Sequence, residues 1–345
     1  MRKECGSMQK EKIVIIAEAG VNHNGSLELA KELVTAAKEC GADIVKFQTA
    51  KLDALVSRHA QMAEYQMKHT GMVTSQKEML ERLLLPYEDF TELAGYCKKT
   101  GIRFLSTPFD TESIAFLNPL QDIWKIPSGE ITNYPYLAAA GRTGKDILLS
   151  TGMSTLEETG QAIRTLRDNG SGEVTLLHCT TEYPAPMQDV NLNAMLTLKR
   201  HFGCRVGYSD HTDGIEVPAA AAAMGASVIE KHLTLDRTME GPDHKASLEP
   251  DSFAAMVRAV RNIEAALGTG IKAPAESEKK NMAVARKSIV ARRNIKKGEI
   301  LSEANLTTKR PGDGLCPMLW PKILGTRAVR DFMADDLIEW TDRMD

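Results

Sequence analysis

The sequence predicts an α/β protein, a (β/α)8 barrel followed by a small, mostly β domain. Eight short runs of β-branched and aliphatic residues alternate with helical patterns over about 250 residues. The pattern then changes near residue 271. The chain has 345 residues, of which 43% are hydrophobic, and this is enough for a barrel and a second core. An open, doubly wound sheet is the alternative, although residues 20–25 lack the glycine spacing of a dinucleotide fold.

The expected strands are runs of four to six mostly apolar residues, which is the usual strand length. They are residues 13–17, 43–47, 103–106, 123–126, 146–150, 174–178, 205–208 and 227–232. Apolar residues at three- and four-residue spacing predict helices between many of them, over residues 27–40, 87–100, 156–169 and 217–224. Gly41, Gly101 and Gly225 follow helical patterns at positions where a C-terminal cap is expected.

The domain boundaries follow from changes in composition. We predict an N-terminal tail at residues 1–12, the barrel at 13–270, a linker at 271–285 and the small β domain at 286–345. Residues 51–85 are too long for an ordinary loop between a strand and a helix. This segment is either a lid over the barrel or an extra helix that patches its wall.

Composition excludes several classes of partner. The formal charge is −3, from 43 basic and 46 acidic residues, so no electrostatic argument favours nucleic acid or an anionic membrane. No apolar run approaches the roughly 20 residues that span a bilayer, and the first residues lack the apolar core of a signal peptide. The six cysteines form no C-x-x-C pair and are expected to be reduced thiols. We therefore expect a cytoplasmic protein.

Polar residues gather where the predicted strands end, and in such barrels the active site lies at the C-terminal ends of the strands. Every strand contributes to this set, which a purely structural rim does not require. Its members are Glu18, Lys46, Gln48, Ser106, Thr107, Lys125, Ser128, Glu130, Ser150, Thr151, His178, Thr180, Thr181, Ser209, Asp210, His211, Glu230 and His232.

One part of this set suits an anion. Lysines supply charge and hydroxyls supply directed donors, so a substrate with a phosphate and a carboxylate fits them. The candidates are Lys46, Lys125, Thr107, Ser128, Ser150 and Ser209. The alternative is a solvated basic rim.

A second part suits a metal ion. His211 and His232 end neighbouring strands, so both imidazoles can face one point. Two histidines with open positions suit a divalent transition metal such as Mn²⁺ acting as a Lewis acid. Asp210 and Glu230 are candidates for orienting the two rings. The alternative is a pair of ordinary core histidines.

Carboxylates form the third part. Glu18, Glu130, Glu230 and Asp243 are candidates for a general acid or base if burial tunes their pKa values. Spacing alone does not choose among them. Glu18 and Glu130 are equally compatible with simple ion pairs to lysines.

Several motifs in this order resemble the sialic acid synthases, over residues 12–340. They are IIAEAGVNHNG (15–25), VKFQT (45–49), STPF (106–109), KIPSGE (125–130), STGM (150–153), HCTTEYP (178–184), GYSDH (207–211) and EKH (230–232). The C-terminal KRPG (309–312), with the turn at Gly298, looks like the antifreeze-protein-like (SAF) domain of these enzymes.

The resemblance implies a role for each matched residue. His211 and His232 would hold Mn²⁺, with Mg²⁺ or Co²⁺ as alternatives. Phosphoenolpyruvate would be held by Lys46, Thr107, Lys125, Ser128, Ser150 and Ser209. Glu18 and Glu130 would be the acid and base. The sugar would contact Gln48, Thr181, Tyr183, Asp243 and Arg310, and Arg310 would reach into a partner's barrel, which implies a domain-swapped homodimer.

The resemblance also implies the reaction. Phosphoenolpyruvate would condense with the aldehyde of an N-acyl mannosamine-type sugar and water, giving a nine-carbon acid and phosphate by C–O cleavage. N-acetylneuraminate synthases commonly carry asparagine and then an apolar residue where this chain has Thr181 and Glu182. The run TTEYPAP (180–186) looks more like the bacterial N,N'-diacetyllegionaminate synthases. That product is expected, with N-acetylneuraminate as the alternative.

Three other hypotheses compete with the sialic acid synthase interpretation. Synthases of seven- or eight-carbon keto acids also condense phosphoenolpyruvate, but they lack the C-terminal domain. A Schiff-base aldolase would use a buried lysine such as Lys125. A purely ice- or carbohydrate-binding protein would not need the polar strand ends.

Overall fold

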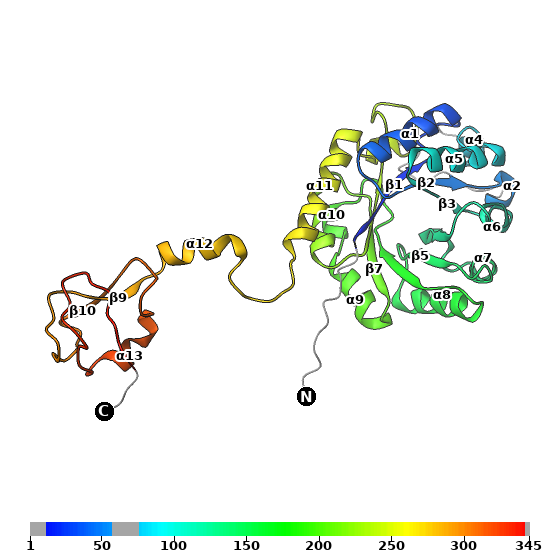
Figure 1. The fold of residues 1–345 in the computed structure, drawn as a ribbon. Coiled ribbons are helices and arrows are strands. Elements are labelled where there is room, and N and C mark those ends of the chain that lie inside the picture. Colours follow the sequence, from blue (N-terminus) through cyan, green and yellow to red (C-terminus); the bar gives the residue numbers. More distant parts are fainter. Residues whose placement is uncertain (1–11, 57–75, 342–345) are drawn as a thin grey trace. The chain divides into compact units, whose positions relative to one another are not determined.

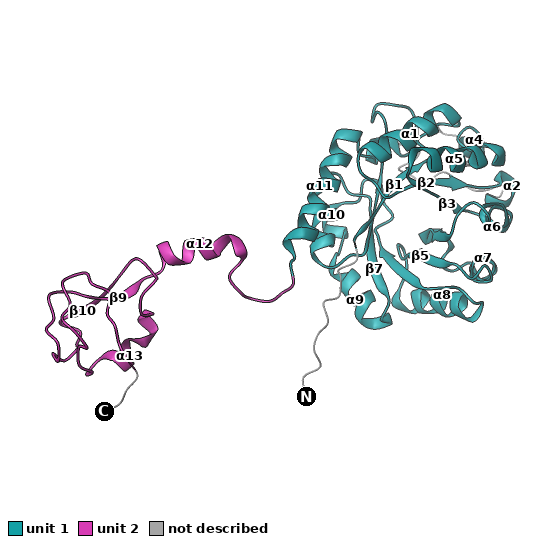
Figure 2. Cartoon of the chain, in the orientation of Figure 1, with its two compact units in different colours: residues 1–268 teal, residues 269–345 magenta. Residues whose placement is uncertain are grey.

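The computed structural model describes residues 12–56 and 76–341. The chain divides into two compact units, residues 1–268 and residues 269–345 (Figure 2). Nearly all of the predicted tail at residues 1–12 lies outside the described residues. None of the helices in the described ranges combines the length and the apolar character that crossing a bilayer requires.

Eight parallel strands form the barrel of the first unit (Figure 1). Their spatial order is β3-β2-β1-β8-β7-β6-β5-β4, and Cα atoms of β3 and β4 come within 8 Å of each other at the closure. This order confirms the predicted barrel and excludes the doubly wound sheet. The strands are β1 (Val14–Gly20), β2 (Ile44–Thr49), β3 (Arg103–Pro108), β4 (Ile123–Ile126), β5 (Asp146–Ser150), β6 (Val174–His178), β7 (Arg205–Asp210) and β8 (Val228–His232).

Helices surround the strands on the outside of the barrel (Figure 1). They are α1 (Leu27–Glu39), α2 (Leu52–Leu55), α4 (Gln76–Glu81), α5 (Tyr87–Thr100), α6 (Thr111–Leu117), α7 (Tyr134–Gly141), α8 (Leu156–Asp168), α9 (Asn193–Phe202), α10 (Glu216–Ala223) and α11 (Pro250–Ala266). The four helices expected from periodicity are all present. Gly41, Gly101 and Gly225 have φ values of 86°, 76° and 93°, as the predicted left-handed caps require.

The barrel interior is layered, and this layering positions the site. Its apolar layer consists of Ile16, Ile44, Leu105, Leu148, Leu177 and Val228. Side chains alternate along a strand, so the residue two positions further on also faces inward. In that next layer the residues are polar on most strands: Glu18, Lys46, Thr107, Ser150 and Glu230. A second, larger apolar core lies between the strands and the helices.

The segment at residues 51–85 is described only in part. Residues 57–75, on which much of the lid prediction falls, lie outside the described residues. In the remainder, Met79 and Leu83 of the α4 region pack on Val21 of the loop after β1. This contact places the described part of the segment at the C-terminal end of the barrel, and both the lid and the patch remain predictions.

The second unit contains a two-stranded antiparallel sheet, β9 (Ser288–Ala291) and β10 (Leu306–Lys309). Its small core includes Ile289, Leu301 and Phe332. The short helix α13 (Trp320–Ile323) packs beside it. A ten-residue helix, α12 (Glu276–Ala285), lies in the range that the sequence indicated as a linker. None of its residues is buried, so no apolar periodicity marked it.

Candidate active site

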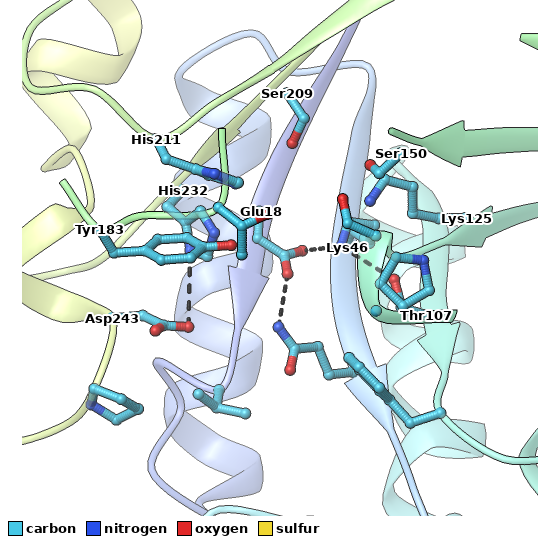
Figure 3. A pocket seen from close by; sticks show the side chains of 18 of the residues that line it. Glu18, Lys46, Thr107, Lys125, Ser150, Tyr183, Ser209, His211, His232 and Asp243 are labelled. Carbon is cyan, nitrogen blue, oxygen red and sulfur yellow. Dashed lines mark hydrogen bonds and ion pairs between the residues drawn. The ribbon is translucent and has the colours of Figure 1, made fainter. Parts of the chain in front are cut away.

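A pocket opens at the C-terminal ends of the barrel strands (Figure 3). Most of the residues predicted for the site line it. They are Glu18, Lys46, Gln48, Thr107, Lys125, Ser128, Ser150, Thr181, Tyr183, Ser209, His211, His232 and Asp243. The two imidazoles and Tyr183 lie on one side of Glu18, and Lys125, Ser150 and Thr107 lie on the other (Figure 3).

Two lysines and two glutamates form a buried charge network on the floor of the pocket. Lys46 Nζ lies 2.6 Å from Glu18 Oε2 and donates to Thr107 Oγ1 at 3.1 Å. Glu230 Oε1 lies 3.3 Å from Lys125 Nζ and 3.9 Å from Lys46 Nζ. All four side chains are at most 5% exposed. The charges balance, so the network tolerates burial only as a unit.

This network shifts the pKa values of Glu18 and Glu230 in opposite directions. Burial raises the pKa of Glu18 above its ordinary value, although Lys46 opposes the shift. Burial alone would also raise the pKa of Glu230, but Lys125 and Lys46 outweigh it and lower that pKa. Ser209 Oγ donates to Glu230 Oε1 at 2.9 Å and favours the same ionised form. Carboxylates whose pKa values are pushed apart are suited to separate roles, one as a proton carrier and one as a fixed anion.

Several buried polar atoms in the pocket have no hydrogen-bond partner among the described residues. They are Ser150 Oγ, Thr181 Oγ1, Glu230 Oε2 and His232 Nδ1. Buried polar groups are nearly always satisfied, so orphaned atoms that line a pocket indicate a ligand or ordered water. The Ser150 hydroxyl suits an anion beside Lys125, and the Thr181 hydroxyl suits a polar group of a second substrate.

Gly152 allows two of the pocket loops to approach each other. A Cβ at this position would lie 2.4 Å from Thr181 Oγ1 and 2.8 Å from Ser128 Oγ. Its N–H donates to Ser128 Oγ at 2.9 Å. Glycine is therefore required for Thr181 and Ser128 to line the same pocket.

The two histidines meet as predicted. The ring centroids of His211 and His232 lie 5.6 Å apart, and the Tyr183 ring packs 4.1 Å from that of His211. Burial lowers the pKa of His211 to about 4 and that of His232 well below its ordinary value, so both rings are neutral at pH 7. Neutral imidazole is the form that binds metal ions.

The hydrogen bonds of these rings fit a metal site. His211 Nδ1 donates to the carbonyl oxygen of Thr180 at 2.6 Å, which leaves its Nε2 as a lone-pair donor. His232 Nδ1 is buried without a hydrogen-bond partner. No group of three or more His, Cys, Asp or Glu side chains arranged for a metal occurs among the described residues. Among the described residues, the two imidazoles are therefore the candidate ligands of a metal ion. Its other ligands would come from water or substrate.

The expected ring-orienting carboxylates do not act in that way. Thr180 supplies the contact to His211 through its main chain. Glu230 accepts from Ser209 instead, and Asp210 is bound by Thr212 and Lys231. Asp243 is the carboxylate beside a ring, with Oδ2 3.9 Å from His232 Nδ1, and burial raises its pKa to about 7.

Glu130 does not line this pocket, and Arg310 belongs to the other compact unit. Glu130 ends the 3-10 turn η1 (Ser128–Glu130), in which Ser128 faces the pocket and the Glu130 carboxylate accepts from Asn133 Nδ2 at 2.6 Å. Arg310 belongs to the second unit, where its Nε donates to the carbonyl oxygen of Ala285 at 3.2 Å. Their proposed roles remain predictions.

The pocket also contains residues that sequence reasoning missed or misplaced. On β6, inward-facing Leu177 is followed two residues later by Cys179, so Cys179 lines the pocket. His178 instead faces the other way and pairs its Nε2 with the carbonyl oxygen of Val190 at 2.8 Å. The alternation of inward and outward residues along the strand was the signal that separates them. An apolar wall of Leu55, Met79, Leu80, Leu83 and Leu84 comes from the segment after β2 and had no motif to reveal it.

The fold and the pocket define a barrel enzyme in which buried lysines, carboxylates and hydroxyls lie beside a histidine pair, with a small appended domain. The chain belongs to the NeuB family, whose model matches residues 33–272, and an SAF domain matches residues 286–342.

Individual relatives agree with this assignment. The chain is 52% identical to N,N'-diacetyllegionaminic acid synthase of Campylobacter jejuni, covering 95% of this chain and 99% of that protein. It is 47% identical to the synthase of the same name from Legionella pneumophila, covering 94% and 93%. A solved N-acetylneuraminic acid (sialic acid) synthetase of Leptospira borgpetersenii superposes with a TM-score of 0.69 at 34% identity, covering 79% of this chain and 91% of that one.

Proposed function

We propose that the chain condenses phosphoenolpyruvate with a 2,4-diacetamido-2,4,6-trideoxymannose to form N,N'-diacetyllegionaminate and phosphate. The observation that carries this proposal is the pocket itself. It joins an anion site, two neutral histidines and two carboxylates of opposite pKa shift at the strand ends of a NeuB-family barrel. The two relatives at 52% and 47% identity, both named for this product, support the choice of sugar.

The chain's own residues have defined tasks in this reaction. Lys125, Ser150 and Ser209, with Thr107 and Ser128, would bind the phosphate of phosphoenolpyruvate, and Lys46 would bind its carboxylate side. Glu230 stays ionised beside this site and would stabilise the positive charge that develops at the phosphate-bearing carbon. Glu18 has a raised pKa and would carry a proton.

His211 and His232 would hold a divalent ion, with Mn²⁺ preferred and Mg²⁺ or Co²⁺ as alternatives. When bound, such an ion polarises the carbonyl oxygen of the sugar aldehyde as a Lewis acid. Gln48, Thr181, Tyr183 and Asp243 would contact the sugar. Of the two positions where the chain departs from N-acetylneuraminate synthases, Thr181 lines the pocket, whereas Glu182 is exposed and does not. Thr181 is therefore the position that bears on the choice of sugar.

A steady-state assay of the full chain tests the proposal. Phosphate release is measured with phosphoenolpyruvate, Mn²⁺ and either the diacetamido sugar or N-acetylmannosamine, and the product is identified by mass. We expect faster turnover of the diacetamido sugar and loss of activity on chelation. Phosphoenolpyruvate labelled with ¹⁸O in its bridging position should deliver the label to phosphate, because the C–O bond breaks. Faster turnover of N-acetylmannosamine would contradict the proposed product.

The Schiff-base alternative is tested by borohydride. Lys125 Nζ lies 3.3 Å from Glu230 Oε1, so the amine that an aldolase would use as its nucleophile is engaged in an ion pair. Borohydride with pyruvate should therefore leave no reduced adduct on the chain, and a trapped adduct on Lys125 would favour the aldolase.

The proposal extends to a domain-swapped homodimer in which Arg310 of one chain contacts the sugar in the partner's barrel. Coexpression of His211→Ala and Arg310→Ala chains tests it. In a swapped mixed dimer, the barrel that keeps His211 receives Arg310 from the other chain, so activity should exceed that of either variant alone. No gain on coexpression would contradict the swap.

A further inference from the structure

A buried ion pair lies on the outer side of the barrel wall, directly behind the two histidines. Asp210 of β7 and Lys231 of β8 face each other across the strand pair, with Lys231 Nζ 2.5 Å from Asp210 Oδ2. Both side chains are 0% exposed. Each stands one residue before a histidine. Since the residues on either side line the pocket, the alternation along a strand directs Asp210 and Lys231 away from it.

The ammonium group holds the β7 chain on both sides of His211. It binds the Asp210 carboxylate before His211 and the carbonyl oxygen of Thr212 after it. Asp210 Oδ1 also accepts from the N–H of Thr212 at 3.1 Å and from its hydroxyl at 2.9 Å. The residue before His232 is thereby bound to both neighbours of His211.

Stability alone does not explain a charged pair at this place. Two ions lose their hydration on burial, and a well-packed apolar pair of similar volume serves a core at least as well. The surrounding layer between strands and helices consists largely of apolar side chains, including Val206 and Ile229 of the same two strands. The ion pair instead joins the end of β7, which precedes His211, to the end of β8, which carries His232.

We propose that Asp210 and Lys231 are positioning residues that fix His211 and His232 at the separation needed to bind one divalent ion. This inference rests on the metal site of the proposed function. It differs from that function because it assigns a role to two residues that touch neither substrate nor the pocket.

The experiment compares two double variants of the full chain. Asp210→Asn/Lys231→Met removes both charges, keeps an acceptor for Thr212 and retains the volume of the lysine stem. Asp43→Asn/Arg261→Met removes the ion pair at the opposite end of the barrel, where Arg261 Nη2 lies 2.6 Å from Asp43 Oδ2. Each variant and the parent are titrated with Co²⁺, followed by its visible absorption, and are melted by circular dichroism.

We expect Asp210→Asn/Lys231→Met to remain folded and to bind Co²⁺ about 10-fold or more weakly than the parent, with an altered absorption band. Asp43→Asn/Arg261→Met should keep the parent's affinity and band, even if it melts earlier. A merely structural pair would change the melting temperature and leave the Co²⁺ spectrum unchanged. Parent-like affinity and spectrum in a folded Asp210→Asn/Lys231→Met variant overturn the proposal.

If Asp210→Asn/Lys231→Met does not fold, the Co²⁺ affinity of Thr212→Val tests the proposal instead. This substitution removes the hydroxyl bond to Asp210 and keeps the shape of the side chain. Weaker Co²⁺ binding than in the parent supports the proposal, and unchanged binding overturns it. A parent that binds no Co²⁺, or that binds it equally well after His211→Ala, contradicts the metal site of the proposed function and the positioning role with it. A histidine-dependent parent with an unaffected Asp210→Asn/Lys231→Met variant contradicts the positioning role alone.

Discussion

The two ends of the barrel use charge in opposite ways. At the C-terminal end, Lys46 and Glu18 are each 3% exposed and lie beside further buried charges and orphaned hydroxyls. At the N-terminal end, Asp43 and Arg261 form an ion pair in which the side chains are 27% and 24% exposed. Asp43 also accepts from Lys12 Nζ and from the N–H of Ile15. The N-terminal end satisfies its charges near solvent, whereas the C-terminal end keeps buried polar groups that a ligand or ordered water would complete.

His211→Ala has the largest expected effect at the C-terminal end, because the proposed function assigns this imidazole to the divalent ion and not to the fold. We expect kcat to fall at least about 10³-fold, since loss of the bound ion removes the electrostatic stabilisation of the developing charge. The measurement is phosphate release at saturating substrates, with Co²⁺ titration beside it. His201→Ala on the exposed face of α9 is the matched control and should retain parent activity. Equal activity of both variants would exclude His211 from catalysis.

Glu18→Gln and Glu130→Gln change the same type of residue at two positions near the C-terminal ends of the strands. Glu18 lies in the pocket with a raised pKa, so its loss should lower kcat about 10²-fold, the usual contribution of a general acid or base. Glu130 points to Asn133 and does not line the pocket, so its loss should change kcat less than about 2-fold. Both are measured by phosphate release. A large loss with Glu130→Gln would instead support the role that the resemblance implies for Glu130, as a second catalytic carboxylate.

Lys125→Met tests the anion side of the C-terminal end. Losing one charge-assisted contact should raise the KM for phosphoenolpyruvate about 10- to 100-fold. The KM for the sugar should change far less, because Lys125 lies across the pocket from the histidines and Tyr183 (Figure 3). Initial rates with each substrate varied in turn separate the two constants. Equal changes in both would indicate that the variant disturbs the whole network through Glu230.

The sequence was sufficient to predict the strands because each carries its own apolar run between turn signals. Strands β4, β5 and β6 begin and end at the predicted residues. The order around the barrel follows from chain order, since consecutive parallel strands with crossover helices pair as neighbours. This local information also placed Glu18, Lys46 and Thr107 at the strand ends, two positions beyond an inward-facing apolar residue.

The finer choices required coordinates. Glu130 and Glu230 both stand near strand ends, but the 3-10 turn directs Glu130 to Asn133, whereas β8 directs Glu230 into the pocket. His178 and Cys179 are adjacent, and strand alternation separates them only once the inward-facing register of β6 is fixed. Lys231 reads as a charged residue within a strand, and nothing in the sequence indicates that Asp210 would neutralise it in the wall.

Asp43→Asn has the smallest expected effect on activity and tests the N-terminal end by itself. Burial alone would raise the pKa of Asp43, but hydrogen bonds from Lys12 and Ile15 and the charge of Arg261 lower it. A carboxyl whose pKa is lowered by folding stabilises the protein above its unfolded pKa of about 3.9 and loses that contribution as the pH falls through the folded value.

At pH 7, Asp43→Asn should therefore melt about 2–4 °C below the parent. This difference should narrow as the pH falls below about 4, where the parent's carboxyl takes up a proton and comes to resemble the amide. Thermal unfolding by circular dichroism at pH 7, 5 and 3.5 measures it. Phosphate release at pH 7 should stay within about 2-fold of the parent. A difference in melting temperature that is the same at every pH would show that Asp43 acts through its shape and not its charge. Lowered activity at unchanged stability would show that the two ends of the barrel are coupled.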